Sequence, residues 1–348
     1  MAKQKKRMRT AAVIRSDGTV LLGSKVSCDG FSASAPFRIQ THVHQDHMTD
    51  FSTSKGEQDI IMTRPTRDLL IAILNCEIPD RNNILTLDEG RQHQVADGTV
   101  ELMDSGHMLG SAHVRVTLKD GFRVGYSSDF FWPLFRVFEV DELVVDATYG
   151  SPDAVRRYRQ QEVEERFVQL VHDRLRRGPV VVLGYRGRLQ YGMSLLSGCT
   201  MHPILATRRV ATVASVYKNH GFSIDPWLET ESDEAKQLVL NGSRYLAFVE
   251  LTEQRNHPWV RAVQKVTLSA FMVPREDPIM DYGNGDFRIA LTDHADFAGT
   301  LEFIRASAAR RVITHPGQGD AYALADAVRS RLGIQAFVGP QIPIRGWG

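Results

Sequence analysis

The sequence predicts an α/β protein, and three observations lead to this fold class. From about residue 160 onward, apolar runs alternate with segments whose apolar residues recur at helical spacing, which is typical of a parallel sheet covered by helices on both faces. Before about residue 150, short apolar runs separated by turns predominate. A hydrophobic content of 43% in 348 residues is ample for a core. We therefore expect a β-rich first part and a strand-and-helix second part.

The first part is predicted to begin with a hairpin. Ser16, Asp17 and Gly18 form a turn signal between two apolar runs, with glycine where a positive φ is needed. Leucine and isoleucine residues at helical spacing predict a helix over residues 67–74 that packs on a sheet face. Short apolar or alternating runs predict strands at residues 11–14, 19–22, 37–40, 60–62, 99–103, 114–118, 122–126 and 143–145.

The second part is predicted to alternate strands with helices. Val163, Phe167 and Leu175 share one face of a helix over residues 161–175, and Gly178 is a candidate C-cap. The fully apolar run 179–183 follows as a buried strand. Residues 230–243 are very polar and are interpreted as a segment that departs from the strand-and-helix alternation, an excursion from the sheet. The same patterns predict helices at residues 188–196, 297–308 and 321–332, and strands at 202–206, 287–291, 311–313 and 334–338.

Composition limits the broad class of the protein. The 42 lysine and arginine residues nearly balance 41 acidic residues, so overall charge neither favours nor excludes a nucleic-acid partner. No apolar run approaches the roughly 18 residues of a membrane span, and no charged-then-apolar leader opens the chain. Three scattered cysteines fit a reducing compartment and provide no cysteine-type zinc site. These features predict a cytoplasmic protein without a membrane association.

Residues 41–51 carry the densest chemistry of the chain. His42, His44, Asp46 and His47 lie within six residues, directly after a predicted strand. Because side chains alternate in an extended segment, His42 and His44 face the same side and can bind one metal ion. If the chain then turns into a helix, Asp46 and His47 can reach a second ion. The competing interpretation is a polar turn whose histidines are hydrogen-bonded.

Two later residues complete this candidate site. His107 lies in a glycine-flanked loop after a strand and would be the third imidazole around the first ion. Asp129 ends another strand, and its two carboxylate oxygens could bridge both ions. Each residue alone is more often a turn or capping residue. Their order after the first cluster is what favours a metal site.

Taken together, these segments resemble the metallo-β-lactamase superfamily. The His-x-His-x-Asp-His run of residues 42–47, the Ser-Gly-His-x-x-Gly-Ser segment 105–111 and the Ser-Asp pair at 128–129 are similar to its metal-binding signature. Three further segments resemble motifs of its β-CASP nuclease branch. They are residues 144–150 with Asp146, residues 291–297 with His294, and residues 312–318 with His315. Six ordered motifs are far more specific than any one of them.

The resemblance implies both a fold and a division of the chain. The expected fold is a metallo-β-lactamase αββα sandwich with an inserted β-CASP α/β cap domain. Residues 1–155 would form the first part of the core, 156–285 the cap, and 286–348 the closing part of the core. Three positions depart from the usual pattern: Tyr191 replaces an acidic residue, Ser128 a glycine, and Pro316 a glycine after the third-motif histidine. The last two affect loop geometry.

The resemblance also implies the ligand sets. The first ion would be bound by His42, His44, His107 and Asp129, and the second by Asp46, His47, Asp129 and His315. The expected cofactors are two divalent cations, zinc being the first choice and manganese or iron the alternatives. Two such ions about 3.5 to 4 Å apart can hold a hydroxide between them and clamp the oxygens of a phosphodiester. The implied activity is hydrolysis of DNA or RNA in nucleic-acid processing or repair.

Four residues are expected to act beside the ions. His294 is the candidate proton donor to the departing sugar oxygen, or a phosphate contact, and Asp146 would keep its ring charged and oriented. The alternatives are a histidine at a helix N-terminus and a structural carboxylate. Arg186 and Arg188, which precede a helix of the cap, are candidates for binding substrate phosphates. Their alternative is a solvated surface pair.

Within this branch, the sequence most resembles messenger-RNA 3′-end processing factors and ligase-associated DNA exonucleases. Two other functions compete with a nuclease. One is a catalytically silent scaffold subunit of a nucleic-acid processing complex. The other is a small-molecule metallohydrolase, which is disfavoured because such relatives lack the cap and the segments around His294 and His315.

Overall fold

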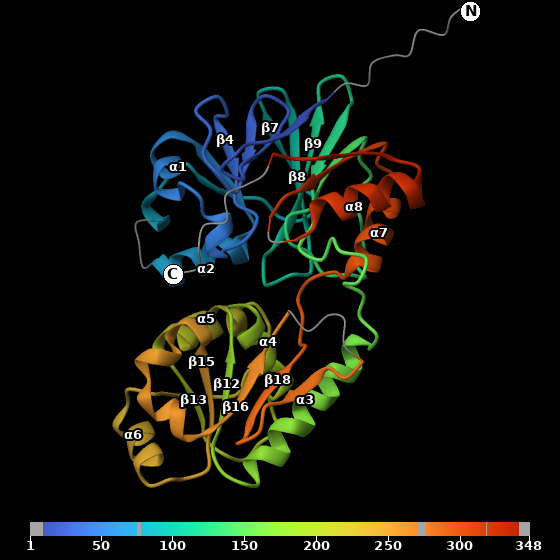
Figure 1. Cartoon of the computed structure of the whole chain (residues 1–348). Helices are drawn as coiled ribbons and strands as arrows, with labels where there is room; N and C mark the ends of the chain where they lie inside the picture. Colours follow the sequence, from blue (N-terminus) through green and yellow to red (C-terminus); the bar gives the residue numbers. More distant parts are fainter. Residues whose placement is uncertain (1–9, 75–77, 271–275, 318, 341–348) are drawn as a thin grey trace, which may run out of the picture.

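The computed structural model describes residues 10–74, 78–270, 276–317 and 319–340, so Gln318 of the third motif lies outside the described residues. Figure 1 shows two lobes, one above the other. The first lobe contains two sheets, of six and seven strands, and the second lobe is built around a third sheet of seven strands. The expected α/β class is confirmed.

The six-stranded sheet of the first lobe begins with the predicted hairpin. Strands β1 and β2 pair antiparallel, with Ala12 opposite Leu22, and β3 to β6 then pair in parallel. Two elements follow the strand that precedes the histidine cluster: a single 3₁₀ turn η1 (Gln45–His47) and helix α1 (Phe51–Glu57). The strands are β1 (Ala12–Ile14), β2 (Val20–Leu22), β3 (Val26–Cys28), β4 (Phe37–Ile39), β5 (Asp59–Met62) and β6 (Ile84–Thr86).

The second sheet of this lobe has the order β20-β19-β11-β10-β9-β8-β7. Two of its strands come from the last part of the sequence: the strand at 311–315 pairs in parallel with the strand at 142–146, and the strand at 335–338 pairs in parallel with 311–315. The closing segment therefore completes a sheet begun much earlier. The strands are β7 (Gln92–Val95), β8 (Gly98–Asp104), β9 (Ala112–Leu118), β10 (Arg123–Tyr126), β11 (Glu142–Asp146), β19 (Arg311–His315) and β20 (Gln335–Val338).

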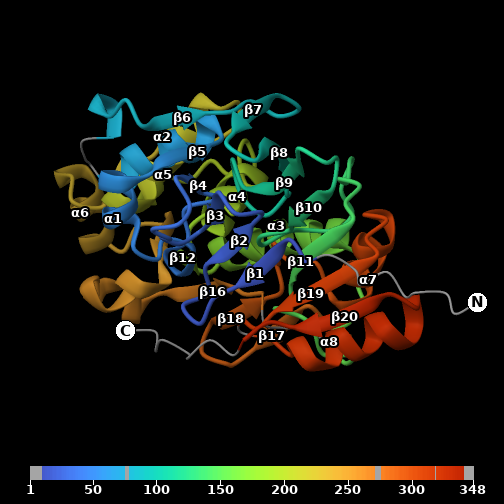
Figure 2. The same cartoon turned by 90° about the horizontal axis from the view of Figure 1, so that it is seen from above.

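The two sheets of the first lobe pack face to face. One apolar cluster joins Val20, Leu22 and Ile61 of the first sheet to Val100 and Val114 of the second. Helices α1 and α2 (Arg64–Leu74) lie outside the first sheet, and α7 (Phe297–Ala306) and α8 (Ala321–Ala327) lie outside the second (Figure 2). The predicted last helix continues beyond α8 as a π-helical turn, Val328–Leu332.

The second lobe contains a mainly parallel sheet in the order β14-β13-β15-β12-β16-β18-β17, as the alternating pattern predicted. Six of its elements are not among the predicted ones: the helices at residues 208–219 and 233–240, and the strands at 228–229, 246–250, 264–268 and 279–281. Its strands are β12 (Val180–Gly184), β13 (Ile204–Ala206), β14 (Leu228–Glu229), β15 (Leu246–Glu250), β16 (Gln264–Leu268), β17 (Ile279–Asp281) and β18 (Asp286–Ile289). Its helices are α3 (Gln160–Leu175), α4 (Arg188–Leu195), α5 (Arg208–Asn219) and α6 (Asp233–Leu240), the last inside the predicted polar excursion.

One predicted boundary needs correction. The division at residues 285/286 falls at the start of β18, which pairs with β16 through Val266 and Phe287. Because β18 is hydrogen-bonded into the third sheet, the chain leaves this lobe after Ile289 rather than before Asp286.

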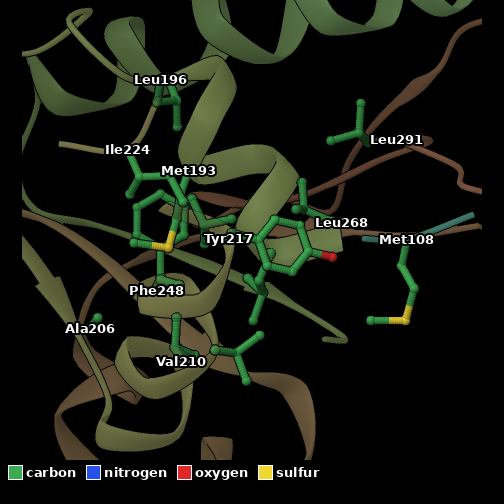
Figure 3. Packing of buried hydrophobic residues seen from close by; sticks show 14 of the residues in the cluster. Met108, Met193, Leu196, Ala206, Val210, Tyr217, Ile224, Phe248, Leu268 and Leu291 are labelled. Carbon is green, nitrogen blue, oxygen red and sulfur yellow. The ribbon is translucent and has the colours of Figure 1, made fainter. Parts of the chain in front are cut away.

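The lobes contact each other through apolar side chains. Met108 and Leu291 belong to the same buried cluster as Tyr217 and Phe248 of the second lobe. Figure 3 shows the Tyr217 hydroxyl directed toward Met108, and this hydroxyl accepts a hydrogen bond from the Leu109 amide at 3.1 Å. Burial of this contact fixes the position of the second lobe over the loop that carries His107. No helix in the described part of the chain is long and apolar enough to cross a membrane.

Candidate metal centre

Three imidazoles converge between the lobes. The ring centroids of His42, His44 and His107 lie 4.9 to 5.0 Å apart. Together with Asp129 they form a group whose candidate ligand atoms all lie within 4.8 Å of one another. His42 comes from the extended chain after β4 and His107 from the loop after β8, so the second sheet delivers the third ring to the first two.

The outer nitrogen of each ring has a partner that fixes the ring orientation. His42 Nδ1 lies 3.1 Å from the Thr41 hydroxyl. His44 Nε2 donates to the Arg186 carbonyl at 3.1 Å, and His107 Nδ1 donates to the Asp293 carbonyl at 3.0 Å. A proton held on the outer nitrogen leaves a lone pair on the inner one, which is the arrangement that metal-binding histidines require.

Asp129 lies between two sets of residues. Its Oδ2 atom is 3.8 Å from His42 Nε2 and 3.6 Å from His107 Nε2. Its Oδ1 atom is 3.3 Å from His47 Nε2. One carboxylate oxygen therefore faces the three-histidine group and the other faces His47, as expected for a ligand shared by two ions.

Of the residues expected around a second ion, His47 lies on the other side of Asp129. His47 Nε2 is 4.0 Å from Asp46 Oδ2, and the Asp46 side chain is half exposed. His315 ends β19 opposite Asp146 of β11, and its Nε2 atom contacts the Gly18 carbonyl at 3.1 Å. Asp46, His47 and His315 belong to none of the groups of converging ligand atoms in the described part of the chain, which are built on His42, His44, His107, Asp129, Asp146, Asp293 and His294.

Burial and charge divide the histidines into two groups. Burial lowers the pKa of His42 and His44, and that of His107 to about 4, so these rings are neutral near pH 7 and free to bind a cation. Burial also disfavours protonation of His47, but the Asp129 and Asp29 carboxylates outweigh it and raise its pKa well above the usual value. A cation among these carboxylates would compete with that proton.

His294 lies at the edge of the centre, directly before helix α7. Its Nδ1 atom is 3.8 Å from Asp146 Oδ2, and its Nε2 atom is 3.9 Å from Asp129 Oδ2 and from Asp293 Oδ1. Burial lowers its pKa, but the surrounding carboxylates of Asp146, Asp129 and Asp293 prevail and raise it to about 9. The expected His294 and Asp146 pair is therefore brought together by the fold.

Arg186 and Arg188 are not a solvated surface pair. Arg188 is buried and its guanidinium forms an ion pair with Asp293 at 2.5 Å. Arg186 Nε lies 3.4 Å from Glu250 Oε1, while its carbonyl accepts the hydrogen bond from His44. Both arginines connect the second lobe to the histidine centre, and both charges already have carboxylate partners.

Comparison with known proteins finds several relatives in sequence. A protein of Acidianus ambivalens, "Uncharacterized protein in lig 3'region", is 40% identical over 104 residues, which cover 29% of this chain and 74% of that protein. Transcription termination factor FttA of Pyrococcus abyssi is 28% identical over 192 residues, 45% of this chain. An RNase J-like protein of Methanocaldococcus jannaschii is 25% identical over 166 residues, 42% of this chain. The chain belongs to the β-CASP branch of the metallo-β-lactamase superfamily.

The matches differ in extent. The aligned regions span 30% of the length of the Pyrococcus factor and 39% of that of the RNase J-like protein. A crystal structure of a protein of unknown function from Enterococcus faecalis V583 aligns over 89% of this chain and 80% of its own, with a TM-score of 0.59 and 13% identity, which shows a shared fold. No protein-family model matches the sequence.

One departure of this β-CASP protein from its family has a structural explanation. Ser128, which stands in place of a common glycine, has φ = 52°, in the left-handed region that glycine occupies most easily. Its hydroxyl donates to Thr41 Oγ1 at 2.7 Å, beside His42. This hydrogen bond offsets part of the backbone strain and ties the Asp129 loop to the first histidine segment.

Two residues of the centre are not among the predicted ones. Asp29 lies at the end of β3 and accepts hydrogen bonds from the Thr41 hydroxyl at 2.7 Å and from His47 Nδ1 at 2.8 Å. Asp293 binds Arg188 by its side chain and His107 by its carbonyl. A Cys-Asp-Gly sequence at a strand end and a second aspartate beside His294 are the only local signals, and neither is specific.

Proposed function

We propose that the protein is a two-metal-dependent nuclease that hydrolyses phosphodiester bonds of DNA or RNA. The observation that carries this proposal is the position of Asp129, with one oxygen facing His42 and His107 and the other facing His47. The names of the relatives, a transcription termination factor and an RNase J-like protein, support a nucleic-acid substrate. The protein would act in nucleic-acid processing or repair.

The proposal includes a division of labour between the lobes. The first lobe, with two packed sheets and outer helices, would be the αββα core, and the second lobe the β-CASP cap. The cap would occupy residues 156 to 289, which extends the predicted boundary to the end of β18. The polynucleotide would pass between the lobes, where the histidine centre lies.

The residues present suit two divalent cations. His42 Nε2 is buried and has no hydrogen-bond partner in the described part of the chain, which is the condition expected of an unfilled ligand position. The first ion would be bound by His42, His44, His107 and Asp129. The second would be bound by Asp46, His47, Asp129 and His315. All ligands are nitrogen or oxygen, which suits zinc, manganese or iron.

When bound, the two cations would supply Lewis acidity that activates water and neutralises the phosphate oxygens. The chain itself would position the leaving group. His294 lies between Asp129 and Asp146, and its Nε2 atom faces the centre. From this position the ring can donate a hydrogen bond to the departing sugar oxygen or to a phosphate oxygen, and Asp146 keeps it oriented.

The test combines metal content with cleavage. Purified protein should contain a divalent metal, hydrolyse bis-p-nitrophenyl phosphate, and cleave end-labelled DNA or RNA oligonucleotides. Asp46→Ala and His294→Ala should each abolish cleavage. His202→Ala, a histidine next to β13 in the second lobe, should cleave like the unchanged protein.

Two outcomes would reject the proposal. Full cleavage by Asp46→Ala would contradict the two-ion mechanism. A protein that binds no divalent metal and cleaves no phosphodiester would favour the scaffold alternative, and activity restricted to thioesters or lactams would favour the small-molecule hydrolase.

A further inference from the structure

A cavity of about 580 Å³ lies between the lobes and adjoins the histidine centre. His107 is part of its wall and is also one of the three converging imidazoles. Met108 and Phe131 line it from the first lobe, and Tyr191 and Tyr217 from the second. Its volume lies within the range of small-ligand pockets, and its shared wall places any occupant next to the proposed reaction centre.

The charges of the cavity do not suit a phosphate. The Arg188 guanidinium is already paired with Asp293 at 2.5 Å. Among the other described lining residues, Arg64 is the one side chain with a permanent positive charge. Four acidic residues of the cavity lining, Asp88, Glu89, Asp104 and Glu164, outnumber it. A polyanionic backbone would be repelled here, so the charge distribution favours the uncharged part of a nucleotide.

The walls do suit a flat aromatic group. Phe131 lines the cavity, and the guanidinium of Arg156 covers its ring at 5.2 Å from the centroid. Phe131 directly follows the Asp129 loop, and its amide donates to the Ser105 carbonyl at 2.9 Å. The ring is thus fixed to the two loops that deliver His107 and Asp129. Stacking on such an aromatic side chain is a common way to bind an unpaired base.

One polar group inside the cavity is pre-oriented. The Tyr191 hydroxyl donates to Glu164 Oε1 at 2.5 Å, and both side chains line the cavity. Burial raises the pKa of Tyr191, so the hydroxyl stays a donor at neutral pH. Glu164 Oε2 has no hydrogen-bond partner among the described residues and remains an acceptor. A glutamate of this kind pairs with exocyclic amino groups, such as N4 of cytosine.

We infer that this cavity is a nucleobase subsite that binds one unpaired base carrying an exocyclic amino group, next to the phosphodiester to be cleaved. Glu164 accepts a hydrogen bond from the amino group, Tyr191 holds Glu164 in place, and Phe131 supplies a stacking surface. Cytosine, adenine and guanine carry such an amino group, and uracil and thymine do not. The inference rests on the proposed nuclease function and adds a base preference to it.

The experiment compares homopolymeric oligonucleotides of cytosine or adenine with those of uracil or thymine, in whichever sugar series the unchanged protein cleaves. Glu164→Met keeps the length of the side chain but removes the acceptor. It should lower kcat/KM for the amino-bearing substrates about tenfold and leave the rates for uracil or thymine nearly unchanged, because a hydrogen bond to a charged group is lost for one class only. The base preference is the ratio of kcat/KM for the amino-bearing substrates to kcat/KM for the uracil or thymine substrates. Tyr191→Phe should lower this ratio by a smaller factor than Glu164→Met.

Glu165→Gln is the matched control, since Glu165 is exposed on the same helix and is not part of the cavity wall. It should keep the ratio of the unchanged protein. An equal ratio in Glu164→Met and the unchanged protein would overturn the inference while leaving the nuclease function intact. If the unchanged protein cleaves neither oligonucleotides nor bis-p-nitrophenyl phosphate, the nuclease proposal fails. Binding of fluorescently labelled homopolymers then tests the base preference directly, and equal affinity for homopolymers with and without an exocyclic amino group would overturn it.

Discussion

Replacing Arg38 should show how much the hydrogen bonds that hold the histidine segment contribute to the free energy of unfolding. Arg38 is fully buried at the centre of β4. Its guanidinium donates to Gln40 Oε1 at 2.8 Å, to the Thr49 carbonyl at 2.8 Å and to the His47 carbonyl at 3.1 Å. Gln40 in turn donates to the His42 carbonyl at 2.6 Å. One side chain therefore ties together both ends of the segment that carries four candidate ligands.

The expected loss of stability in Arg38→Met follows from the acceptors that lose their donor. The His47 carbonyl keeps a second donor, Gln40 Nε2 at 3.0 Å, but the Thr49 carbonyl, Gln40 Oε1 and Ser54 Oγ lose theirs. Three orphaned acceptors cost about 3 to 9 kcal/mol. Removing a buried charge offsets part of this, because burial outweighs the neighbouring acidic groups and lowers the pKa of Arg38 to about 10. We expect a net loss of about 3 kcal/mol in the free energy of unfolding, near the lower end of measured buried-pair deletions.

Hydrogen exchange of the β4 and α1 amides measures this loss in the first lobe alone, and urea denaturation provides an independent value. Arg123→Met is the control, since its half-buried guanidinium pairs with Glu139 and Asp141 at 3.3 and 3.4 Å, and exposed pairs contribute at most about 1 kcal/mol. If Arg38→Met costs no more than Arg123→Met, the buried network does not hold the segment and the reasoning is refuted.

Two further predictions concern acid stability and metal affinity. Burial lowers the pKa of His113 to about 4, so its protonation in the unfolded chain should cost up to about 3 kcal/mol of stability as the pH falls from about 6.5 to about 4. In urea titrations, His113→Phe should make the free energy of unfolding depend less on pH over that range. Loss of the hydrogen bond to the Ser127 carbonyl can destabilise the protein near pH 7 without changing this slope. An unchanged dependence on pH would contradict the prediction. Asp29→Asn should weaken divalent metal binding about 10- to 100-fold in calorimetry by releasing His47, and an unchanged affinity would show that Asp29 does not orient that ring.

Local patterns predicted most of the regular structure. The turn at Ser16 to Gly18 gives the expected hairpin, and the apolar face of Val163 and Phe167 is buried along α3. These predictions succeed because turn geometry and helical periodicity depend on neighbours in the sequence. Helix α5 was absent from the predicted elements although Val210, Val213 and Tyr217 share one face, so the signal was present in the sequence. The boundary at 285/286 was misplaced because pairing of β18 with β16 depends on a partner about twenty residues away.

The sequence by itself determined that His42, His44, Asp46 and His47 are available together, since their proximity is imposed by the chain. It also placed Asp129, His294 and His315 at the ends of elements, where side chains can reach a common pocket. Only the tertiary structure decided which oxygen of Asp129 faces which histidine, and that Asp29 orients His47.

Arg186 and Arg188 show most clearly what only the tertiary structure decided. Nothing near Arg188 in the sequence announces Asp293, which lies 105 residues further along the chain and neutralises its charge. Whether a charged side chain is free for a ligand depends on burial and on distant partners, and both are properties of the folded chain rather than of a local pattern.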